Sequence, residues 1–264
     1  MNIYPFSLNF DRQLPVAFFP FLVSGKPVPG PICMLSSLEA GDMKFTPGLE
    51  NPNRSRFFAS LANRFSLESP LVYSVKQVHS RDVILVNEET PLQGAQADGL
   101  LTALPGRWLS VTVADCLPIF LRDREGLHRA LLHSGWKGTG IVLRALSIFT
   151  EQWHIPSREI LAVLGPCIRS ECYRVDEERA RLFEDEFGGN DGPYPLGSVV
   201  KIGASQSGDP EYYLDLQAAN ARLLAKSGIE HVALCQDCTG CNPRLGSYRR
   251  QGPSPFTSMV ALIN

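Results

Sequence analysis

Histidine is scarce in this sequence, with five residues among 264. A multicopper oxidase needs many imidazoles to hold its copper clusters, and five leave almost none spare for such sites. The histidine content therefore argues against a laccase-type oxidation of phenols.

The sequence also lacks a long apolar run and an excess of one charge. Its longest apolar stretch, 14–23, is interrupted by Pro15 and Pro20 and is too short to span a bilayer. The first residues lack the basic region and apolar core of a signal peptide, so we expect a cytoplasmic protein. With 25 basic and 27 acidic residues, we expect neither nucleic acid nor a membrane as a partner. Seven cysteines without a secretory signal are expected to be thiols or ligands rather than disulfides.

The composition is that of a packed protein, since 44% of the residues are hydrophobic and 20% are charged. No repeat or long linker divides the chain, which predicts a single domain over residues 1–264. The first fifty residues are rich in proline and glycine and predict irregular structure with a few short strands. Further on, strands and helices mix without regular βαβ alternation, which favours an α+β sandwich.

Hydrophobic spacing and capping residues predict the remaining elements. The predicted strands cover residues 71–79, 82–86, 108–122, 127–133, 160–164 and 231–235. The predicted helices are one capped by Asn53, one from Gly138, one from Asp176 to Phe187, and one from Asp215 to a stop at Gly228.

The strands 108–122 and 127–133 form a predicted hairpin. If its turn is centred on Arg124 and Glu125, paired residues have numbers that sum to 249, and Cys116 lies opposite His133. Cross-strand Cβ atoms are about 4.5–5.5 Å apart. A thiolate and an imidazole at that separation can share a metal ion, or act as nucleophile and base. A buried thiol and a capped core histidine remain the structural alternative.

A glycine-flanked turn, Ser134–Gly138, follows His133 and opens the next predicted helix. Free backbone N–H groups at such a turn favour an anion such as phosphate. Lys137 can supply a point charge to that anion.

Several short motifs along the chain resemble the YfiH/LACC1 (DUF152) family. The blocks occur in family order between about residues 70 and 250: Gln77-Val78-His79, Ala97-Asp98-Gly99, Ala114-Asp115-Cys116-Leu117-Pro118, His133-Ser134-Gly135-Trp136-Lys137-Gly138, Leu164-Gly165-Pro166, Cys172-Tyr173-Arg174-Val175, Cys238-Thr239 and Ser247-Tyr248-Arg249-Arg250. The resemblance implies a multilayered α/β/β/α sandwich with mixed sheets, related to a bacterial toxin deamidase with a Cys–His active site.

The resemblance also implies an activity and a metal site. The family is described as polyphenol oxidase (laccase) and as purine nucleoside phosphorylase with adenosine deaminase activity. Its substrates are adenosine, inosine, guanosine and S-methyl-5′-thioadenosine, with phosphate. Its two histidines and one cysteine correspond to His79, Cys116 and His133, which are the implied metal ligands and catalytic residues. Zinc and copper both accept this donor set.

The remaining implied roles concern substrate and phosphate. Lys137 and one of Arg249 or Arg250 are expected to hold phosphate. Asp115 and Asp98 are expected to position substrate or to orient a ligand histidine; carboxylates of a turn or strand end that accept backbone N–H groups are the alternative. The chain departs from the family at Lys137, where arginine is usual, and at residues 253–257, which replace a Thr-Gly-Arg segment.

Two other functions remain open at this point. One is a metal-free cysteine hydrolase or amidase that uses Cys116 as nucleophile and His133 as base. The other is a metal-binding regulator without turnover.

The run Cys235, Cys238 and Cys241 is a separate cysteine motif. It lacks the fourth cysteine of a ferredoxin motif, so an iron–sulfur cluster is not expected. A zinc site completed by a distant ligand stays open, whereas Cys167 and Cys172 are predicted to be buried thiols.

Overall fold

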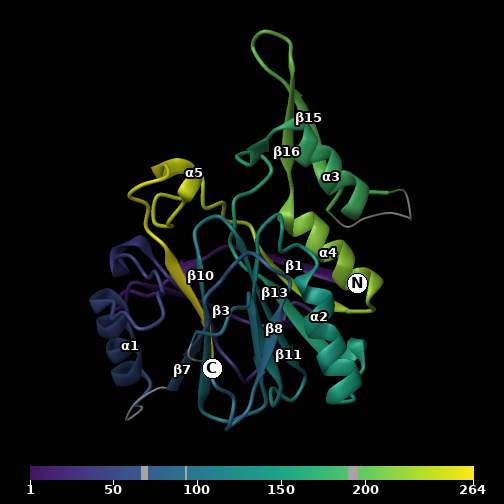
Figure 1. Cartoon of the computed structure of the whole chain (residues 1–264). Coiled ribbons are helices and arrows are strands. Elements are labelled where there is room, and N and C mark those ends of the chain that lie inside the picture. Colours follow the sequence, from purple (N-terminus) through teal and green to yellow (C-terminus); the bar gives the residue numbers. More distant parts are fainter. Residues whose placement is uncertain (67–70, 93, 190–195) are drawn as a thin grey trace.

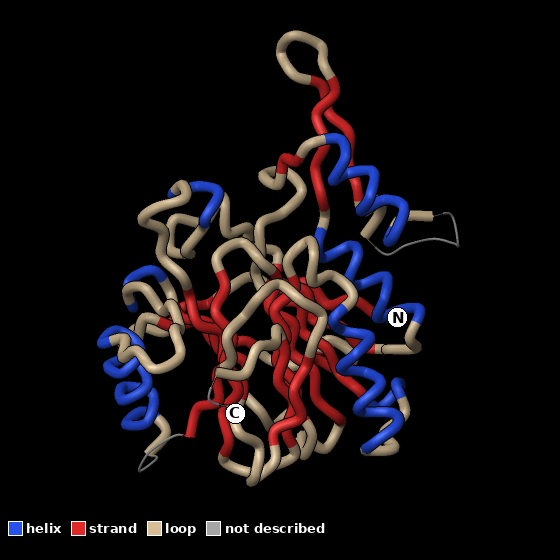
Figure 2. Tube along the Cα trace, viewed as in Figure 1, coloured by secondary structure: helices blue, strands red, loops and turns tan. Residues whose placement is uncertain are grey.

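A computed structural model describes residues 1–66, 71–92, 94–189 and 196–264. Two β-sheets pack face to face, and helices cover both outer faces (Figures 1 and 2). This arrangement confirms the predicted α/β/β/α sandwich with mixed sheets. Among the described helices, none has the length and apolar character needed to cross a bilayer.

The larger sheet of the described chain has seven strands in mixed orientation. Their order is β1 (Asn2–Phe6), β17 (His231–Cys235), β13 (Ile160–Leu164), β11 (Leu117–Asp123), β12 (Arg129–Ser134), β9 (Gly99–Thr102) and β8 (Val83–Val86). The strand β11 is buried on both faces: Ile119 points to the helices and Phe120 to the second sheet. This explains its continuous apolar sequence.

The second sheet has six strands within the described residues. Their order is β2 (Asn9–Phe10), β3 (Val16–Phe19), β6 (Cys33–Ser36), β18 (Met259–Ile263), β10 (Arg107–Val113) and β7 (Leu71–Ser74). The segment 1–50 is therefore more regular than its proline and glycine content suggests. β6 pairs with β18 near the other end of the sequence. Residues within β6 alone do not predict a partner that far away in the sequence.

Three buried clusters correspond to the three layer contacts. Phe57 and Leu61 of α1 (Pro52–Arg64) pack against Trp108 of the six-stranded sheet. Between the sheets, Phe120 contacts the cluster that contains Val111. In Figure 1, α1 lies on the left and the helices of the other outer layer lie on the right.

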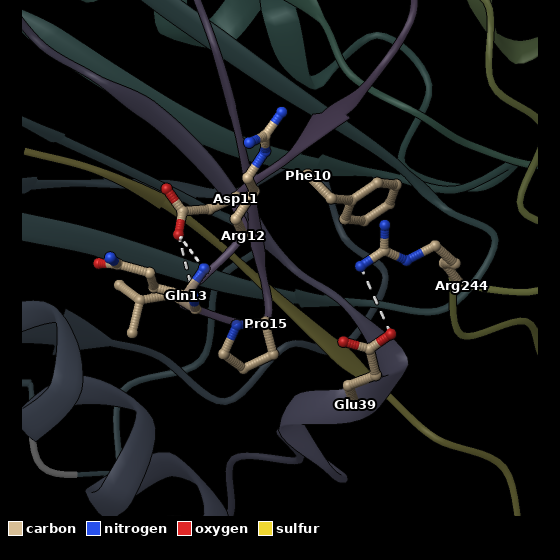
Figure 3. A pocket seen from close by; sticks show the side chains of 8 residues that line it. Phe10, Asp11, Arg12, Gln13, Pro15, Glu39 and Arg244 are labelled. Carbon is tan, nitrogen blue, oxygen red and sulfur yellow. Dashed lines mark hydrogen bonds and ion pairs between the residues drawn. The ribbon is translucent and has the colours of Figure 1, made fainter.

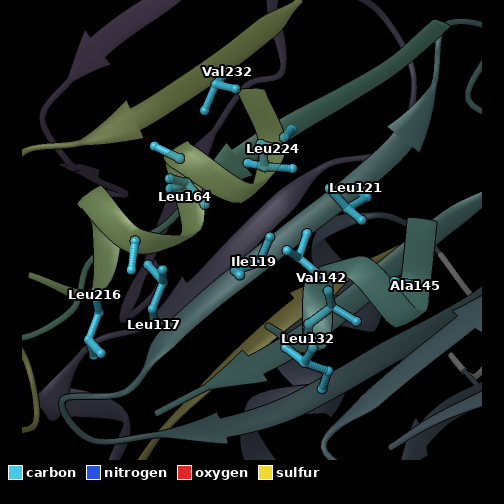
Figure 4. Packing of buried hydrophobic residues seen from close by; sticks show 14 of the residues in the cluster. Leu117, Ile119, Leu121, Leu132, Val142, Ala145, Leu164, Leu216, Leu224 and Val232 are labelled. Carbon is cyan, nitrogen blue, oxygen red and sulfur yellow. The ribbon is translucent and has the colours of Figure 1, made fainter. Parts of the chain in front are cut away.

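The other outer layer contains α2 (Ile141–Ser147) and α4 (Leu216–Lys226). A π-helix, Ile148–Gln152, continues α2. Figure 4 shows Val142 of α2 and Leu224 of α4 in the cluster that includes Ile119 of β11. This layer fixes the β12–α2 connection, which carries the glycine-flanked turn.

A small sheet and its neighbouring helix project from the sandwich at the top of Figure 1. They are β14 (Arg174–Val175), β15 (Val200–Ala204), β16 (Pro210–Leu214) and α3 (Glu177–Phe187). The remaining described elements are β4 (Leu22–Val23), β5 (Lys26–Pro27), α5 (Tyr248–Gln251) and two 3-10 turns, Leu38–Ala40 and Ser157–Glu159.

The predicted long strand over 108–122 is wrong. β10 and β11 belong to different sheets, and Ala114-Asp115-Cys116 joins them. Asp115 has φ 89°, a left-handed conformation that ends an extended strand. β10 and β11 are both apolar because both are buried. The composition therefore gives no sign that the chain passes from one sheet to the other between them.

The predicted hairpin register is also wrong. His133 pairs with Pro118, so paired numbers sum to 251. The loop extends through His128, whose N–H donates to the Asp123 carboxylate at 3.2 Å, and Gly126 adopts φ 77° within it. The displacement is two residues, so the alternation still places Cys116 and His133 on the same side.

Other boundaries differ less. The predicted strand 71–79 ends at Ser74, and the helix predicted from Gly138 begins at Ile141. Asn51 rather than Asn53 caps α1. The predicted helix caps at Asp176 and Asp215 and the strands 160–164 and 231–235 are confirmed.

Candidate metal centre

Two histidines and one cysteine meet near the loops at one edge of the sandwich. His79 follows β7, Cys116 lies between β10 and β11, and His133 is in β12. Their ligand atoms all lie within 4.8 Å of one another. His133 is buried, Cys116 is half-buried and His79 is exposed, so the cluster opens toward solvent on the His79 side.

The buried Asp98 orients His133. Its carboxylate lies 2.8 Å from Nδ1 of His133. Because an ionised carboxylate only accepts hydrogen bonds, Nδ1 carries the proton of this contact. The neutral ring then has Nε2 as its free lone pair, the atom that can bind a metal ion.

Asp98 also holds the loop that carries His79. Its carboxylate accepts the backbone N–H groups of Val78 at 3.2 Å, His79 at 3.0 Å and Ser80 at 2.6 Å. These bonds offset the strained backbone of His79, which has φ 60°. Burial works against the charge of Asp98, but the hydrogen bonds from His133 and Ser80 lower its pKa overall.

Cys116 and His133 form a thiolate–imidazolium pair when no metal ion is bound. Burial opposes the thiolate, but the neighbouring His133 lowers the pKa of Cys116 to about 6. Burial likewise opposes the imidazolium, but Cys116 and Asp98 raise the pKa of His133. A thiolate at neutral pH is the form that both a metal ligand and a nucleophile require.

Gly135 leaves the space in which the cluster sits. A Cβ atom at this position would lie 2.9 Å from Sγ of Cys116 and 3.4 Å from Cδ2 of His79. The first distance is too short for a side chain in contact. Glycine at this place in the turn is therefore part of the site.

The residues present fit a metal ion. Two imidazoles and one thiolate are common ligands of zinc and copper, and Asp98 supplies the carboxylate that often supports a ligand histidine. Three protein ligands leave a further position for water or substrate, as catalytic zinc sites require.

Asp115 fixes the connection between β10 and β11, which also contains Cys116. Its two carboxylate oxygens accept hydrogen bonds from Oγ1 of Thr239 at 2.6 Å and from the backbone N–H of Arg249 at 2.7 Å. The structure thus gives Asp115 protein partners on both oxygens.

The two neighbouring arginines differ in what their guanidinium groups contact. Arg250 donates to backbone carbonyl oxygens of Thr239 at 2.6 Å and Asn242 at 2.9 Å, and it also contacts that of Leu245. Arg249 donates from Nη2 to the Arg174 carbonyl at 2.8 Å and is otherwise exposed.

Aromatic and cationic side chains of the motif segments pair with one another, and one further arginine joins them. The Arg249 guanidinium lies 5.6 Å from the Tyr173 ring centre. Burial and the nearby Cys116 raise the pKa of Tyr173 to about 12. The exposed Lys137 and the half-buried Arg179 lie 5.5 and 4.7 Å from the Trp136 ring centre. Arg179 lies outside every quoted motif and had no signal in the sequence.

A separate surface pocket of about 520 Å³ lies beside β2 and the 3-10 turn Leu38–Ala40 (Figure 3). Its lining includes Arg244, which stacks on Phe10 at 4.0 Å and pairs with Glu39 at 3.4 Å. No predicted site residue lines it, so we assign it no part in the chemistry.

Comparisons with known proteins connect this geometry to a family. The model described as "Multi-copper polyphenol oxidoreductase laccase" matches residues 50–264. The chain is 31% identical over 217 residues to a purine nucleoside phosphorylase of Mycobacterium tuberculosis, covering 81% of this chain and 80% of that relative. It is 30% identical over 201 residues to purine nucleoside phosphorylase YfiH of Escherichia coli, covering 75% and 74%.

Solved structures share the fold. YlmD from Geobacillus stearothermophilus has a TM-score of 0.78 at 24% identity, covering 97% of this chain and 98% of that one. The Bacillus licheniformis hypothetical protein YfiH has a TM-score of 0.74 at 22% identity, covering 89% and 92%. The motif resemblance is thereby confirmed, and the chain belongs to the YfiH (DUF152) family.

Proposed function

We propose that this protein is a metal-dependent purine nucleoside phosphorylase whose active site is the cluster of His79, Cys116 and His133. The observation that carries the proposal is the convergence of these three side chains within 4.8 Å. The names of the relatives from Mycobacterium tuberculosis and Escherichia coli support it. The substrates we propose are adenosine, inosine, guanosine and S-methyl-5′-thioadenosine, each with phosphate.

In phosphorolysis, a phosphate oxygen bonds to C1′ of the sugar while the bond from C1′ to the base nitrogen breaks. The base leaves with the electron pair and takes up a proton, so the products are a free base and a sugar 1-phosphate. Bound zinc or copper supplies Lewis-acid stabilisation of negative charge in this site. The protein must therefore hold phosphate near the metal ligands and keep the purine in place.

Lys137 and Arg249 are the cations we assign to phosphate. Both are exposed, Lys137 is two residues after Gly135, and the backbone N–H of Arg249 donates to Asp115 at 2.7 Å. Arg249 uses Nη2 for one carbonyl, which leaves other N–H groups of its planar fork for an anion. Arg250 instead donates to several carbonyl oxygens. We therefore assign Arg250 to holding the loop rather than the substrate.

Tyr173 offers an aromatic surface for the purine. It is half-buried, the charge of Cys116 reaches it and raises its pKa, and the Arg249 guanidinium lies over its ring. Stacking on an aromatic ring suits every purine and selects weakly among them, which agrees with a substrate range of several nucleosides. Asp115 positions Arg249 by accepting its backbone N–H, and it positions Cys116 as the residue directly before it in the chain.

Adenosine deaminase activity is the second reaction we propose for the site. In it, water replaces the amino group at C6, and the products are inosine and ammonia. The two protons of the water must end on the leaving ammonia and on the base.

The test is to incubate protein of known metal content with adenosine, with and without phosphate, and to follow adenine, ribose 1-phosphate and inosine by chromatography. Phosphate-dependent adenine release that Cys116→Ala and His79→Ala both abolish supports the phosphorylase. Inosine formation without phosphate supports the deaminase. Metal-loaded protein that yields neither product overturns both and leaves a metal-binding regulator. Oxidation of a phenol by copper-loaded protein would instead support a laccase.

His154→Ala is the matched control for His79→Ala. Both histidines are exposed and have positive φ, 56° at His154 and 60° at His79. Each substitution therefore changes an imidazole at a strained backbone position. Only His79 belongs to the cluster, so His154→Ala is expected to keep full activity.

A cysteine hydrolase is the second candidate, because Asp98, His133 and Cys116 also have the order of an orienting acid, a base and a nucleophile. This candidate predicts that alkylation of Cys116 abolishes activity, while chelators and His79→Ala do not. The phosphorylase predicts loss of activity in all three cases.

A further inference from the structure

A second group of sulfur atoms meets outside the cluster already described. Sγ atoms of Cys172, Cys238 and Cys241 all lie within 4.8 Å of one another. Those of Cys172 and Cys241 are 3.2 Å apart. Cys172 precedes β14, whereas the other two lie in the loop after β17, so the fold brings together segments 66 residues apart in the sequence.

Only two cysteines of the run Cys235, Cys238 and Cys241 belong to this group. Cys235 is buried at the end of β17, and its Sγ contacts the Asp237 carboxylate at 3.7 Å. The third sulfur atom of the group comes from Cys172 instead. The expectation that Cys172 is a buried thiol is wrong, because it is half-buried beside the exposed Cys241.

The loop is shaped to let the sulfur atoms approach. A Cβ atom at Gly240 would lie 3.0 Å from Cβ of Cys172, 3.3 Å from its Sγ and 3.5 Å from Sγ of Cys238. The backbone N–H of Arg169 donates to Sγ of Cys238 at 3.4 Å. Hydrogen bonds of this kind support thiolate sulfur in metal sites.

We propose that Cys172, Cys238 and Cys241 bind a thiophilic cation of the zinc or copper(I) class, separately from the centre at His79. Three thiolates are ligands that such ions prefer over the harder magnesium and calcium. Cys238 is buried and Cys241 is exposed, so the ion enters from solvent at Cys241 and keeps a position open there.

The site braces the neighbouring metal centre. Thr239, between two of the sulfur ligands, donates to the Asp115 carboxylate at 2.6 Å, and Asp115 precedes Cys116. Tyr173 follows Cys172 directly, and the charge of Cys116 acts on its hydroxyl group and raises its pKa. A bound ion therefore joins the two segments that place Thr239 and Tyr173 against the cluster.

The test is the zinc content of protein purified and dialysed under reducing conditions, measured for the wild type and single variants. We expect two zinc ions in the wild type and one in either His79→Ala or Cys241→Ser. Because Cys241 is exposed, its replacement leaves the core intact. Cys235→Ser is the control from the same run and is expected to keep two.

Cobalt substitution shows which site remains. Cobalt in His79→Ala is expected to give an intense thiolate-to-metal absorption band from three sulfur ligands, and cobalt in Cys241→Ser a weaker band from the single thiolate of Cys116. The proposal is overturned if wild type and Cys241→Ser bind the same amount of zinc. It is also overturned if Cys172 and Cys241 form a disulfide and no second ion binds after reduction.

Discussion

The Asp98 carboxylate lies 2.8 Å from Nδ1 of His133, and the same carboxylate accepts the backbone N–H of His79 at 3.0 Å. One buried acid thus orients one histidine of the cluster through its ring and the other through its main chain. This shared support explains why two histidines from distant segments meet at Cys116.

Asp98→Asn is expected to weaken zinc binding by about 10- to 100-fold, because the amide removes the charge that orients His133 and supports its basicity. A competition titration against a chromophoric chelator measures the change. Asp123→Asn is the matched control, since Asp123 contacts Nδ1 of His128 at the same 2.8 Å but outside the cluster. Equal affinity in Asp98→Asn and wild type would refute the role of Asp98.

Gly135→Ala tests the space around Cys116. The added Cβ at 2.9 Å from Sγ must displace the thiolate or the turn, so we expect loss of zinc affinity and of phosphorolysis by at least about tenfold. Gly203→Ala is the control, because its Cβ would meet only the Tyr213 ring at 3.4 Å. Unchanged metal binding in Gly135→Ala would contradict this packing.

The reactivity of Cys116 in metal-free protein should depend on pH in a specific direction. His133 lowers the pKa of Cys116 to about 6 against burial. The thiolate therefore persists as pH falls from 9 toward 6 and is lost below about 6. Iodoacetamide labelling followed by peptide mass spectrometry gives the rate at this cysteine alone. His133→Ala should move the midpoint upward, and a wild-type midpoint near 9 would contradict the ion pair.

Alanine substitutions of the two arginines of α5 should change different properties of the protein. Arg249→Ala is expected to raise the KM for phosphate by about tenfold or more, as loss of a charge-assisted contact does, with little change in Tm. Arg250→Ala removes the donor to the carbonyls of Thr239 and Asn242, so it should lower the free energy of unfolding by about 1–3 kcal/mol. Steady-state kinetics and thermal melts separate the two, and the reverse pattern would exchange the assignments.

Local signals in the sequence predict the parts of the fold that local contacts determine. Asp176 and Asp215 cap their helices through their own side chains, accepting N–H groups three residues later. The short apolar runs of β13 and β17 were likewise visible from sequence. Each depends on residues within one element.

The break between β10 and β11 could not be predicted in the same way. Asp115 adopts its left-handed backbone while bonded to Thr239 and Arg249, which are 124 and 134 residues away. Contacts at that separation leave no periodicity in the sequence. The motif resemblance named Cys116 and His133, whereas the hairpin arithmetic placed them together with an incorrect register.

The cysteine pattern shows the same limit. Cys238 and Cys241 are close in sequence, but their partner Cys172 is supplied by tertiary structure. Spacing alone favours Cys235 as the third cysteine of the group, because it is nearer in sequence. Its Sγ instead contacts the Asp237 carboxylate.

Phosphorolysis as a function of metal content shows whether the cluster of His79, Cys116 and His133 is a metal-dependent active site. Chelated wild-type protein is titrated with zinc while the initial rate of ribose 1-phosphate formation from adenosine and phosphate is measured, beside His79→Ala and Cys241→Ser. We predict that the rate is near zero without zinc and rises to saturation in the wild type and in Cys241→Ser. His79→Ala should stay inactive at every zinc concentration. Full activity in metal-free wild-type protein would show that phosphorolysis does not depend on a metal ion at this cluster.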